Sequence, residues 1–389
     1  MRILHLSTRL IIGGSQENTL LSCSGAADHG HTVALAYGPI FGPEGSLLPR
    51  AVADTRIEKF EIPDLTRAVD PLRDWRCAKQ LRRLIHEWEP DVVHTHSSKA
   101  GILGRAAAWS AGVRVVVHTI HGLPFHPYQN WLKNAAYVRA ERWAANRCHA
   151  IVTVADAMTQ VARAHKIGTP AQYTMIRSGM EIAPWFDAAN DRARVRESFG
   201  WNEQTIVLGT VARLAELKGH DDLIDAFTAL LRERANANVA LFWIGDGWWR
   251  QRLVDRLSKA GIADRVVLTG LVDPSEIPRL MSAMDVVVHP SYREGLPRSV
   301  VQGMLSEKPV IAYDVDGTRE VCTSGVTGIL VGAGDRAALT AAAQRLIAHP
   351  SERRAMGARG RELVQHDFDS RVMVERLLGL YDAIASRST

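Results

Sequence analysis

The 389-residue sequence has few cysteines and no long apolar run. Its only cysteines are Cys23, Cys77, Cys148 and Cys322, and none forms a Cys-x-x-Cys pair. Neither a disulfide framework nor a cysteine zinc site is predicted, and a reducing compartment fits this usage. No stretch approaches the roughly 18 apolar residues that a membrane-spanning helix requires, and the first residues are too charged for the apolar core of a signal peptide. We therefore expect a soluble, cytoplasmic protein.

Composition and charge are those of an ordinary globular protein. Hydrophobic residues make up 46% and charged residues 23% of the chain, which argues against disordered, collagen-like and coiled-coil classes. The formal charge of +5 suits phosphorylated ligands or anionic lipid surfaces. Because the sequence contains no dense Lys/Arg block and no recognisable nucleic-acid module, nucleic acid is not an expected partner.

Short β-branched runs alternate with longer segments of helical periodicity, an order typical of parallel sheets covered by helices. The predicted strands are residues 2–6, 32–37, 91–95, 114–119, 150–154, 206–210, 239–244, 266–269, 285–289, 310–313 and 328–331. The main predicted helices are residues 15–28, 72–88, 98–111, 130–147, 221–234, 248–259 and 370–385.

This order predicts an α/β protein with two Rossmann-like, doubly wound domains that face each other across a cleft. The N-terminal domain is expected to span residues 1–180 and the C-terminal domain residues 200–368, because residues 179–200 interrupt the alternation. Ligands of open α/β sheets bind at the loops that follow the strands, so these loops are the place to look for chemistry.

Two common phosphate-binding motifs are absent from the sequence. Gly245-Asp246-Gly247 follows a predicted strand, but the third glycine of a G-x-G-x-x-G motif is replaced by Arg250. The first predicted turn has Gly13-Gly14 without that spacing, and no Walker sequence is present. A dinucleotide oxidoreductase and a P-loop ATPase are therefore not expected.

The loop of residues 212–220 carries two cations, Arg213 and Lys218, between a predicted strand and a predicted helix. At the carboxyl end of a strand, a forked guanidinium and a mobile ammonium can bracket a diphosphate. The alternative is a solvated loop with two unrelated charges, and spacing alone leaves both interpretations open.

The loop of residues 289–299 combines a predicted helix start with a carboxylate. Pro297 is suited to the first helical position, so the helix is predicted to begin there and to offer free N–H groups to an anion. Gly295 permits close backbone approach to a ligand. Glu294 would repel a phosphate unless it binds hydroxyls, such as those of a sugar; alternatively, it only complements the helix dipole.

Several motifs occur along the chain in a characteristic order: Gly13-Gly14, His94-Thr95-His96 with Lys99-Ala100-Gly101, Thr119-Ile120-His121-Gly122, Val211-Ala212-Arg213-Leu214 with Lys218-Gly219, Gly245-Asp246-Gly247, Glu294-Gly295-Leu296-Pro297, Lys308-Pro309-Val310 and Gly317-Thr318-Arg319-Glu320. In this order they resemble the retaining, nucleotide-sugar-dependent GT-B glycosyltransferases of family four. The resemblance covers nearly the whole chain.

The resemblance implies a GT-B fold whose second domain holds the donor and whose last helix, residues 370–389, crosses back to the first domain. It implies a nucleoside diphosphate sugar as co-substrate, with a UDP-sugar favoured, and no obligatory metal or other cofactor. The acceptor is expected to be a saccharide or a lipid-linked hydroxyl in surface polysaccharide or glycolipid assembly.

By the same resemblance, Arg213 and Lys218 would neutralise the donor diphosphate, Glu294 would bind hydroxyls of the donor sugar, and His121 would orient that sugar and stabilise charge. The remaining donor-binding positions that it implies are Gly14, Leu271, Gly295, Leu296, Pro297, Arg298 and Gln302.

Gln302 is a departure from the family pattern, which has a second glutamate eight positions after the first to bind the ribose hydroxyls. A glutamine still donates and accepts hydrogen bonds, but it loses a charge-assisted bond of roughly twice the strength. Donor affinity or nucleotide choice is therefore expected to differ from the family norm.

Histidines are concentrated in the first domain, with His94 and His96 on one predicted strand, His118 and His121 at the end of the next, and His126 shortly after it. Zinc would require further ligands and supporting carboxylates, and these cannot be placed from the sequence. We therefore expect a cleft-lining cluster that binds sugars or phosphate, and no metal site.

Residues 128–147 mix aromatic and basic side chains, a pattern that suits either an anionic membrane surface or ordinary packing with extended arginines. Peripheral membrane contact is thus one open interpretation. Two alternatives to glycosyl transfer are also open: a nucleotide-sugar 2-epimerase, and a catalytically silent nucleotide-sugar-binding protein suggested by Gln302.

Overall fold

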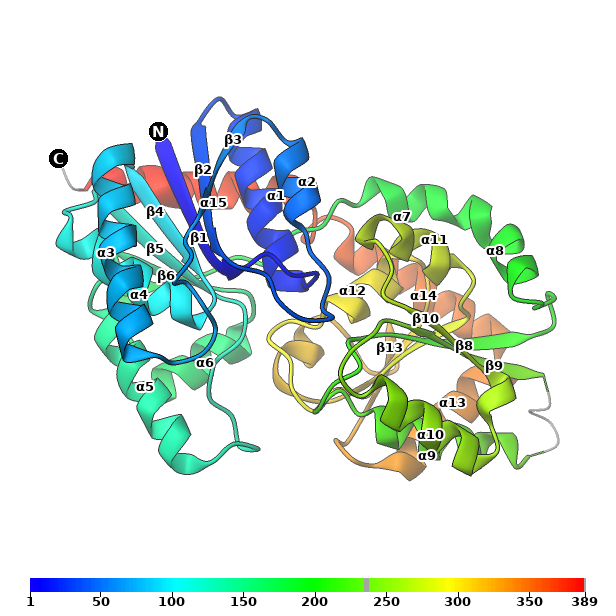
Figure 1. Ribbon diagram of the computed structural model, residues 1–389. Helices are drawn as coiled ribbons and strands as arrows, with labels where there is room; N and C mark the ends of the chain where they lie inside the picture. The colour runs from blue at the N-terminus through cyan, green and yellow to red at the C-terminus, as the bar shows by residue number, and fades with distance from the viewer. Residues whose placement is uncertain (234–237, 388–389) are drawn as a thin grey trace. The chain divides into compact units, whose positions relative to one another are not determined.

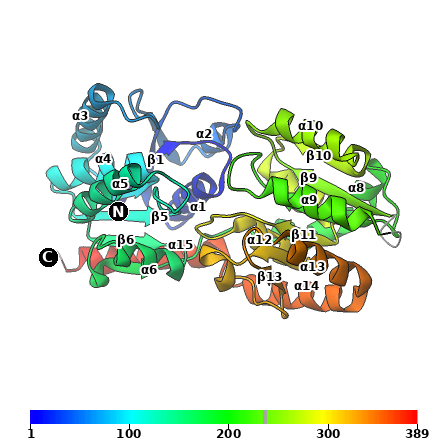
Figure 2. The same cartoon turned by 90° about the horizontal axis from the view of Figure 1, so that it is seen from below.

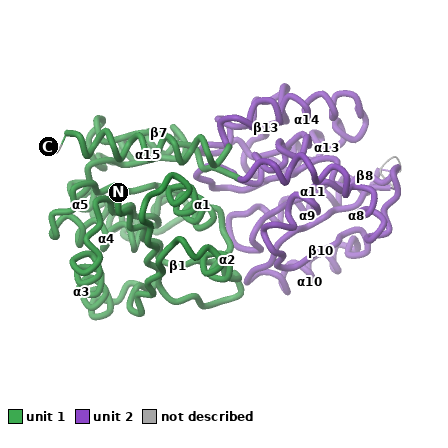
Figure 3. The backbone as a smooth tube through the Cα atoms, turned by 90° about the horizontal axis from the view of Figure 1, so that it is seen from above, with its two compact units in different colours: residues 1–180, 369–389 green, residues 181–368 purple. Residues whose placement is uncertain are grey.

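The computed structural model describes residues 1–233 and 238–387, and it divides into two compact units. Unit 1 comprises Met1–Met180 with Asp369–Thr389, and unit 2 comprises Glu181–Phe368. Figure 3 draws unit 1 in green and unit 2 in purple. Each unit has its own sheet and its own hydrophobic core.

Unit 1 is built on seven parallel strands in the order β3-β2-β1-β4-β5-β6-β7. They are β1 (Arg2–Arg9), β2 (Thr32–Gly38), β3 (Ile57–Glu61), β4 (Val92–His96), β5 (Val115–Ile120), β6 (Ala150–Thr153) and β7 (Tyr173–Met175). The helices are α1 (Gly14–Asp28), α2 (Leu48–Ala53), α3 (Pro71–Trp88), α4 (Ser98–Ser110), α5 (Trp131–Ala145), α6 (Asp156–Ala164) and α15 (Ser370–Ala385) (Figure 1).

Unit 2 is built on six parallel strands in the order β10-β9-β8-β11-β12-β13. They are β8 (Ile206–Val211), β9 (Val239–Ile244), β10 (Val266–Gly270), β11 (Val286–His289), β12 (Val310–Tyr313) and β13 (Gly328–Val331). The helices are α7 (Ala183–Asp187), α8 (Arg192–Ser198), α9 (His220–Leu231), α10 (Arg250–Ala260), α11 (Ile277–Ser282), α12 (Arg298–Leu305), α13 (Arg336–Ala348) and α14 (Pro350–Val364).

Both sheets have the Rossmann strand order, so the α/β, doubly wound fold is confirmed. In each unit the order reverses at one point, between β1 and β4 in unit 1 and between β8 and β11 in unit 2. Loops at the carboxyl ends of such a strand pair form the usual ligand site of this fold.

A strand occurs at every position predicted from the sequence, but β3 and β7 were not predicted. β3 carries three charged residues among its five, and β7 has only three residues, so neither has a recognisable apolar pattern. The predicted helix of residues 221–234 corresponds to α9, and its last predicted residue lies outside the described ranges.

The segment that the sequence left between the domains packs on unit 2. Its helices α7 and α8 contact α11. Arg192 donates to the carbonyl oxygens of Ser282 and Met284 and forms an ion pair with Asp285 at 2.6 Å. These two helices were not predicted because they are short, and their charged residues and a proline obscure any helical periodicity. The residues that they contact are also distant in the chain.

The last helix belongs to unit 1. The Ser370 N–H donates to the Met180 carbonyl oxygen at 2.9 Å, where α15 begins. α15 then lies against α1 and β5 (Figure 1, Figure 2). A Cβ on Gly25 of α1 would lie 2.4 Å from Val374, so glycine lets the two helices pack closely.

None of the helices in the described part of the chain is both long enough and apolar enough to cross a bilayer.

Candidate active site

Two loops of unit 2 meet beside the point where its strand order reverses. Residues 212–219 follow β8, and residues 290–297 follow β11. The Leu217 carbonyl oxygen accepts a hydrogen bond from the Tyr292 N–H at 2.8 Å and another from the Ser291 hydroxyl at 3.2 Å. These bonds fix one loop to the other.

Glycines allow the loops to approach one another. Gly219 has a φ of 67°, and a Cβ there would lie 1.8 Å from the Pro290 carbonyl oxygen. Gly245, in the loop after β9, has a φ of 138°, and its Cβ would lie 2.1 Å from the Ala212 carbonyl oxygen. Both positions therefore favour glycine for two reasons: the loops pack too closely for a Cβ, and the backbone adopts a positive φ that other residues rarely adopt.

An ion pair joins the same two loops. Lys218 Nζ lies 2.5 Å from Glu294 Oε1, and the two side chains are 23% and 13% exposed. His289 Nε2 lies 3.0 Å from the same carboxylate oxygen, and Ser299 Oγ lies 2.9 Å from His289 Nδ1. Because a carboxylate only accepts, His289 donates to it from Nε2.

These contacts keep Glu294 ionised. Burial by itself would raise the pKa of this carboxyl, but the Lys218 ammonium and the hydrogen bond from His289 outweigh it and hold the pKa well below its usual range. A second carboxylate, Asp316, accepts from the Glu294 backbone N–H at 2.8 Å. The site thus presents a fixed negative acceptor beside a cation that has further N–H donors.

Arg213 is exposed at the start of the first loop. Its carbonyl oxygen accepts from His220 Nε2 at 2.8 Å, and His220 is only 1% exposed. Burial lowers the pKa of His220 to about 4, so the ring is neutral near pH 7 and its hydrogen is on Nε2. This bond fixes the backbone of the loop that carries Arg213.

The predicted helix start requires a small correction. Pro297 is the residue before the first helical turn, and α12 begins at Arg298. Leu296 is buried and Gly295 is partly exposed, so the buried Leu296 side chain fixes the chain just before the helix begins. Helix N–H groups are still present at this loop, displaced by one residue from the prediction.

The other predicted positions are distributed over both units. Leu271 follows β10 and is 44% exposed. Gln302 lies in α12 and is partly exposed. Gly14 is the first residue of α1, and His121 follows β5; both belong to unit 1. Among the predicted site residues, Lys218 and Glu294 are the pair for which the structure shows direct side-chain contact.

The expectation of a ligand-binding histidine cluster is wrong for most of its members. His94 and His96 are 0% and 1% exposed, and His118 is 3% exposed. β4 lies between β1 and β5 inside the sheet, and every one of its residues is buried. Central strands of a parallel sheet are covered on both faces, which accounts for the burial of His94 and His96. His121 and His126, in the chain after β5, are partly exposed.

Three of the buried rings gather closely enough to be tested as a metal site. Nitrogen atoms of His5, His94 and His96 all lie within 4.8 Å of one another. However, His5 Nδ1 and His96 Nε2 are hydrogen-bonded to each other at 3.1 Å, and both His94 nitrogens have hydroxyl partners, Tyr381 and Thr119. Nitrogens that point at one another do not converge on a single ion, so this geometry does not suit a metal.

His289 and Ser299 were not assigned a role from the sequence. His289 ends β11 and holds Glu294, and Ser299 lies in the first turn of α12 and holds His289. The signal that could have found them is position: both flank the Glu294 loop at the carboxyl end of a central strand.

Comparison with known families covers most of the chain. Residues 12–183 match the family described as Glycosyltransferase Family 4, and residues 191–363 match the family described as Glycosyl transferases group 1. The first match covers most of unit 1, from residue 12 onward and without β1, and the second lies within unit 2.

Individual relatives agree with these matches. The putative glycosyltransferase EpsD of Bacillus subtilis is 32% identical over 72% of this chain and 73% of its own length. The Escherichia coli UDP-Gal:alpha-D-GlcNAc-diphosphoundecaprenol alpha-1,3-galactosyltransferase is 26% identical over 72% of this chain and 73% of its own. The Anabaena protein HepE, solved with UDP-glucose, is 20% identical with a TM-score of 0.82 over 98% of this chain and all of its own. The protein is therefore a glycosyltransferase and belongs to the GT-B glycosyltransferases of family-four type.

Proposed function

We propose that the protein transfers a sugar from a nucleoside diphosphate sugar to a hydroxyl acceptor with retention at the anomeric carbon. The observation that carries this proposal is the cluster of Lys218, Glu294 and His289 on loops at the carboxyl ends of central strands. Arg213 lies on the same loop as Lys218. It combines cations for a diphosphate with an ionised carboxylate for hydroxyl groups.

The cations would stabilise the leaving group. When the bond between the anomeric carbon and the diphosphate oxygen breaks, negative charge develops on the diphosphate, and preorganised donors stabilise such charge well. An ammonium has three N–H donors, so Lys218 can keep its bond to Glu294 and still donate to phosphate. Arg213 and the N–H groups at the start of α12 would supply the other donors.

The carboxylate would hold the sugar. Glu294 is fixed by Lys218 and His289 and stays ionised, so it can accept hydrogen bonds from sugar hydroxyls without first losing a proton. His121 would contact the sugar from unit 1, and Gly14 would permit close approach of the first turn. Leu271, Gly295, Leu296, Pro297, Arg298 and Gln302 would complete the donor site.

A UDP-sugar is the favoured donor, and assembly of surface polysaccharide or glycolipid is the proposed role. The Escherichia coli relative carries UDP-Gal and a diphosphoundecaprenol-linked sugar in its name, and the HepE structure contains UDP-glucose. These names support the class of donor and a saccharide or lipid-linked acceptor.

The experiment that tests the donor is thermal melting with UDP, GDP, ADP and their sugar conjugates. A ligand at 100 times its Kd adds about 2.7 kcal/mol of stability, and we expect this only with uridine nucleotides. Incubation of the stabilising sugar nucleotide with candidate acceptors, followed by NMR of the product's anomeric proton, then reads the stereochemistry. Inversion at the anomeric carbon would contradict the proposed mechanism, and stabilisation by GDP alone would contradict the proposed donor.

Gln302→Glu is expected to strengthen donor binding. A carboxylate at this position restores a charge-assisted hydrogen bond to a ribose hydroxyl, worth about 1 kcal/mol more than the neutral bond, so Kd for UDP should fall about fivefold. Isothermal titration measures this change, and Gln365→Glu, outside the proposed site, is the matched control. An unchanged or higher Kd would remove Gln302 from the ribose site.

No metal is proposed in the reaction, because Arg213 and Lys218 already supply positive charge for the diphosphate. Turnover is therefore expected to be the same after dialysis against EDTA and after addition of Mg²⁺ or Mn²⁺. A large loss of turnover in EDTA that Mg²⁺ or Mn²⁺ restores would show that the two side chains are not sufficient.

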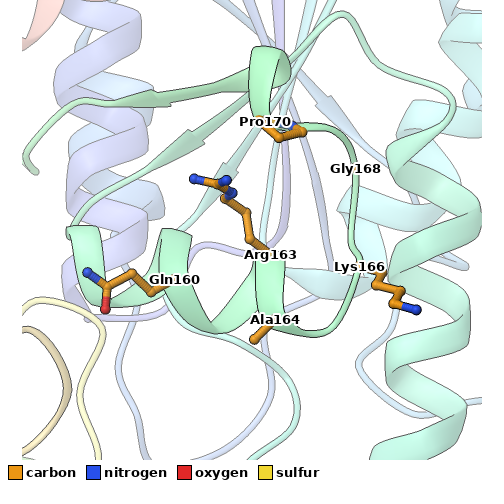
Figure 4. Close-up of a pocket in the computed structure, with 6 residues that line it drawn as sticks. All are labelled: Gln160, Arg163, Ala164, Lys166, Gly168 and Pro170. Atoms are coloured by element: carbon orange, nitrogen blue, oxygen red, sulfur yellow. The ribbon is translucent and has the colours of Figure 1, made fainter.

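We also propose that unit 1 contacts an anionic membrane through α5. Trp131 and Leu132 at its start are 72% and 58% exposed, a combination that suits insertion among lipid headgroups. Arg139 and Arg142 line a surface depression of about 500 Å³ beside the same helix. A neighbouring depression of about 530 Å³ contains two more cations (Figure 4) and is lined by Gln160, Arg163, Ala164, Lys166, Gly168 and Pro170.

Trp131→Ser is expected to weaken binding to vesicles that contain phosphatidylglycerol by about tenfold, because an interfacial aromatic side chain loses its apolar contact. Vesicle sedimentation measures the partition coefficient. Trp248→Ser is the matched control, since Trp248 is also 72% exposed but lies in unit 2. Equal losses in both variants, or no binding by the unchanged protein, would contradict a specific membrane face.

A further inference from the structure

Three histidines of unit 1 form a continuous hydrogen-bonded row that ends at His121. His5 Nδ1 lies 3.1 Å from His96 Nε2, and His96 Nδ1 lies 3.1 Å from His121 Nε2. The ring centroids are 5.4 and 5.3 Å apart, and the ring planes differ by only 20° and 26°. The rings are therefore nearly parallel and joined edge to edge, from β1 through the end of β4 to the residue after β5.

A fourth ring holds the middle of the row in place. The His94 ring lies 4.3 Å from the His96 ring, centroid to centroid. His94 itself is held by hydrogen bonds to the Tyr381 and Thr119 hydroxyls. His96 has little freedom to rotate away from either neighbour, so the row has one geometry.

The two fully buried rings of the row, His5 and His96, are neutral. Burial lowers the pKa of His5 to about 3 and lowers that of His96 well below its ordinary value. A neutral imidazole carries one ring hydrogen, so it donates from one nitrogen and accepts at the other. Both hydrogen bonds of the row must therefore run in the same direction, either toward His121 or away from it.

The buried end of the row selects the direction. His5 Nε2 is buried and has no hydrogen-bond partner among the described residues. If the bonds ran away from His121, this nitrogen would carry a buried, unpaired N–H, and orphaned N–H groups are rarer in proteins than unpaired acceptors. The favourable arrangement leaves His5 Nε2 bare and places the hydrogen on Nδ1.

We infer that His5 and His96 are positioning residues that hold His121 as its Nδ1–H tautomer. His5 Nδ1–H donates to His96 Nε2, and His96 Nδ1–H donates to His121 Nε2, which leaves the His121 hydrogen on Nδ1. His121 then offers a substrate oxygen a hydrogen-bond donor and not a base. This last step rests on the proposed function, in which His121 contacts the donor sugar; the tautomer itself does not.

The first test is the tautomer of His121 in the unchanged, ligand-free protein. Long-range ¹H–¹⁵N correlation spectra of protein labelled in the histidine rings distinguish a protonated nitrogen from a bare one, and His121→Gln assigns the signal. We expect a protonated Nδ1 and a bare Nε2. A protonated Nε2 would overturn the inference, whatever the activity of the enzyme.

The second test changes only whether the side chain at position 5 donates or accepts the hydrogen bond at the buried end of the row. In His5→Asn, the amide nitrogen can replace the Nδ1–H donor, whereas the carboxylate of His5→Asp only accepts and forces every hydrogen in the row to the opposite nitrogen. We expect His5→Asn to retain the tautomer and His5→Asp to reverse it, with kcat about 10²-fold lower for His5→Asp than for His5→Asn, the scale for loss of one preorganised donor.

The outcomes separate the inference from the proposed function. A reversed tautomer with an unchanged kcat would remove His121 from the proposed chemistry and leave the hydrogen-bonded row intact. An unreversed tautomer in folded His5→Asp protein would overturn the row. If His5→Asp does not fold, the spectrum of the unchanged protein still decides the tautomer.

Discussion

Lys218→Ala is expected to lower kcat by about 10²–10³-fold, the scale for loss of one preorganised donor to developing charge. Lys218 is the cation that bridges the two loops, and its ammonium lies against Glu294. Its removal would take a positive charge from the leaving diphosphate and would also leave the Glu294 carboxylate without its nearest counter-charge. Steady-state kinetics at saturating donor measures kcat.

The control for this substitution is Lys259→Ala. Lys259 is an exposed lysine in the last turn of α10, outside the proposed site, so kcat should not change. A melting curve of each variant separates loss of folding from loss of chemistry. Near-normal turnover of folded Lys218→Ala would remove this residue from the mechanism.

Gly219→Ala is expected to lower kcat/KM by about 10²-fold, because a misplacement of about 1 Å at a catalytic group costs that much. The new Cβ would lie 1.8 Å from the Pro290 carbonyl oxygen, so the loop must move, and Lys218 is the adjacent residue. The substitution also places a side chain at a φ of 67°, which costs about 1–2 kcal/mol of stability.

Gly261→Ala separates the two effects of that substitution. Gly261 has a φ of 69°, but a Cβ there would meet no atom within 4 Å. It should therefore show the backbone cost in its melting temperature and leave kcat/KM unchanged. If both variants lose the same activity, backbone strain and not the contact between the loops would be responsible.

The sequence alone predicted where the two Rossmann-like sheets lie and which loops carry charge. Strand patterns and their order are local properties, and the carboxyl end of a parallel strand is known once the strand is located. For the same reason, Arg213, Lys218 and Glu294 could be singled out without knowledge of their contacts. The pairing of Lys218 with Glu294 could not, because 76 residues separate them along the chain.

The histidines show that a sequence pattern on a strand does not predict burial. His94 and His96 alternate on one strand, which places them on one face of the sheet, but it does not reveal whether that face is covered. The tertiary structure places β4 between β1 and β5 and buries all five of its residues. A cluster expected to bind ligands is therefore mostly core, and only its last two members, His121 and His126, are partly exposed.

The sequence by itself thus determined the α/β class, the family and the loops that bear charged side chains, because each depends on residues close together in the chain. The tertiary structure decided which side chains meet: the hold of His289 on Glu294, the packing of residues 181–199 on unit 2, and the row from His5 to His121. Burial and long-range hydrogen bonds arise only when distant strands are brought side by side, so no local pattern encodes them.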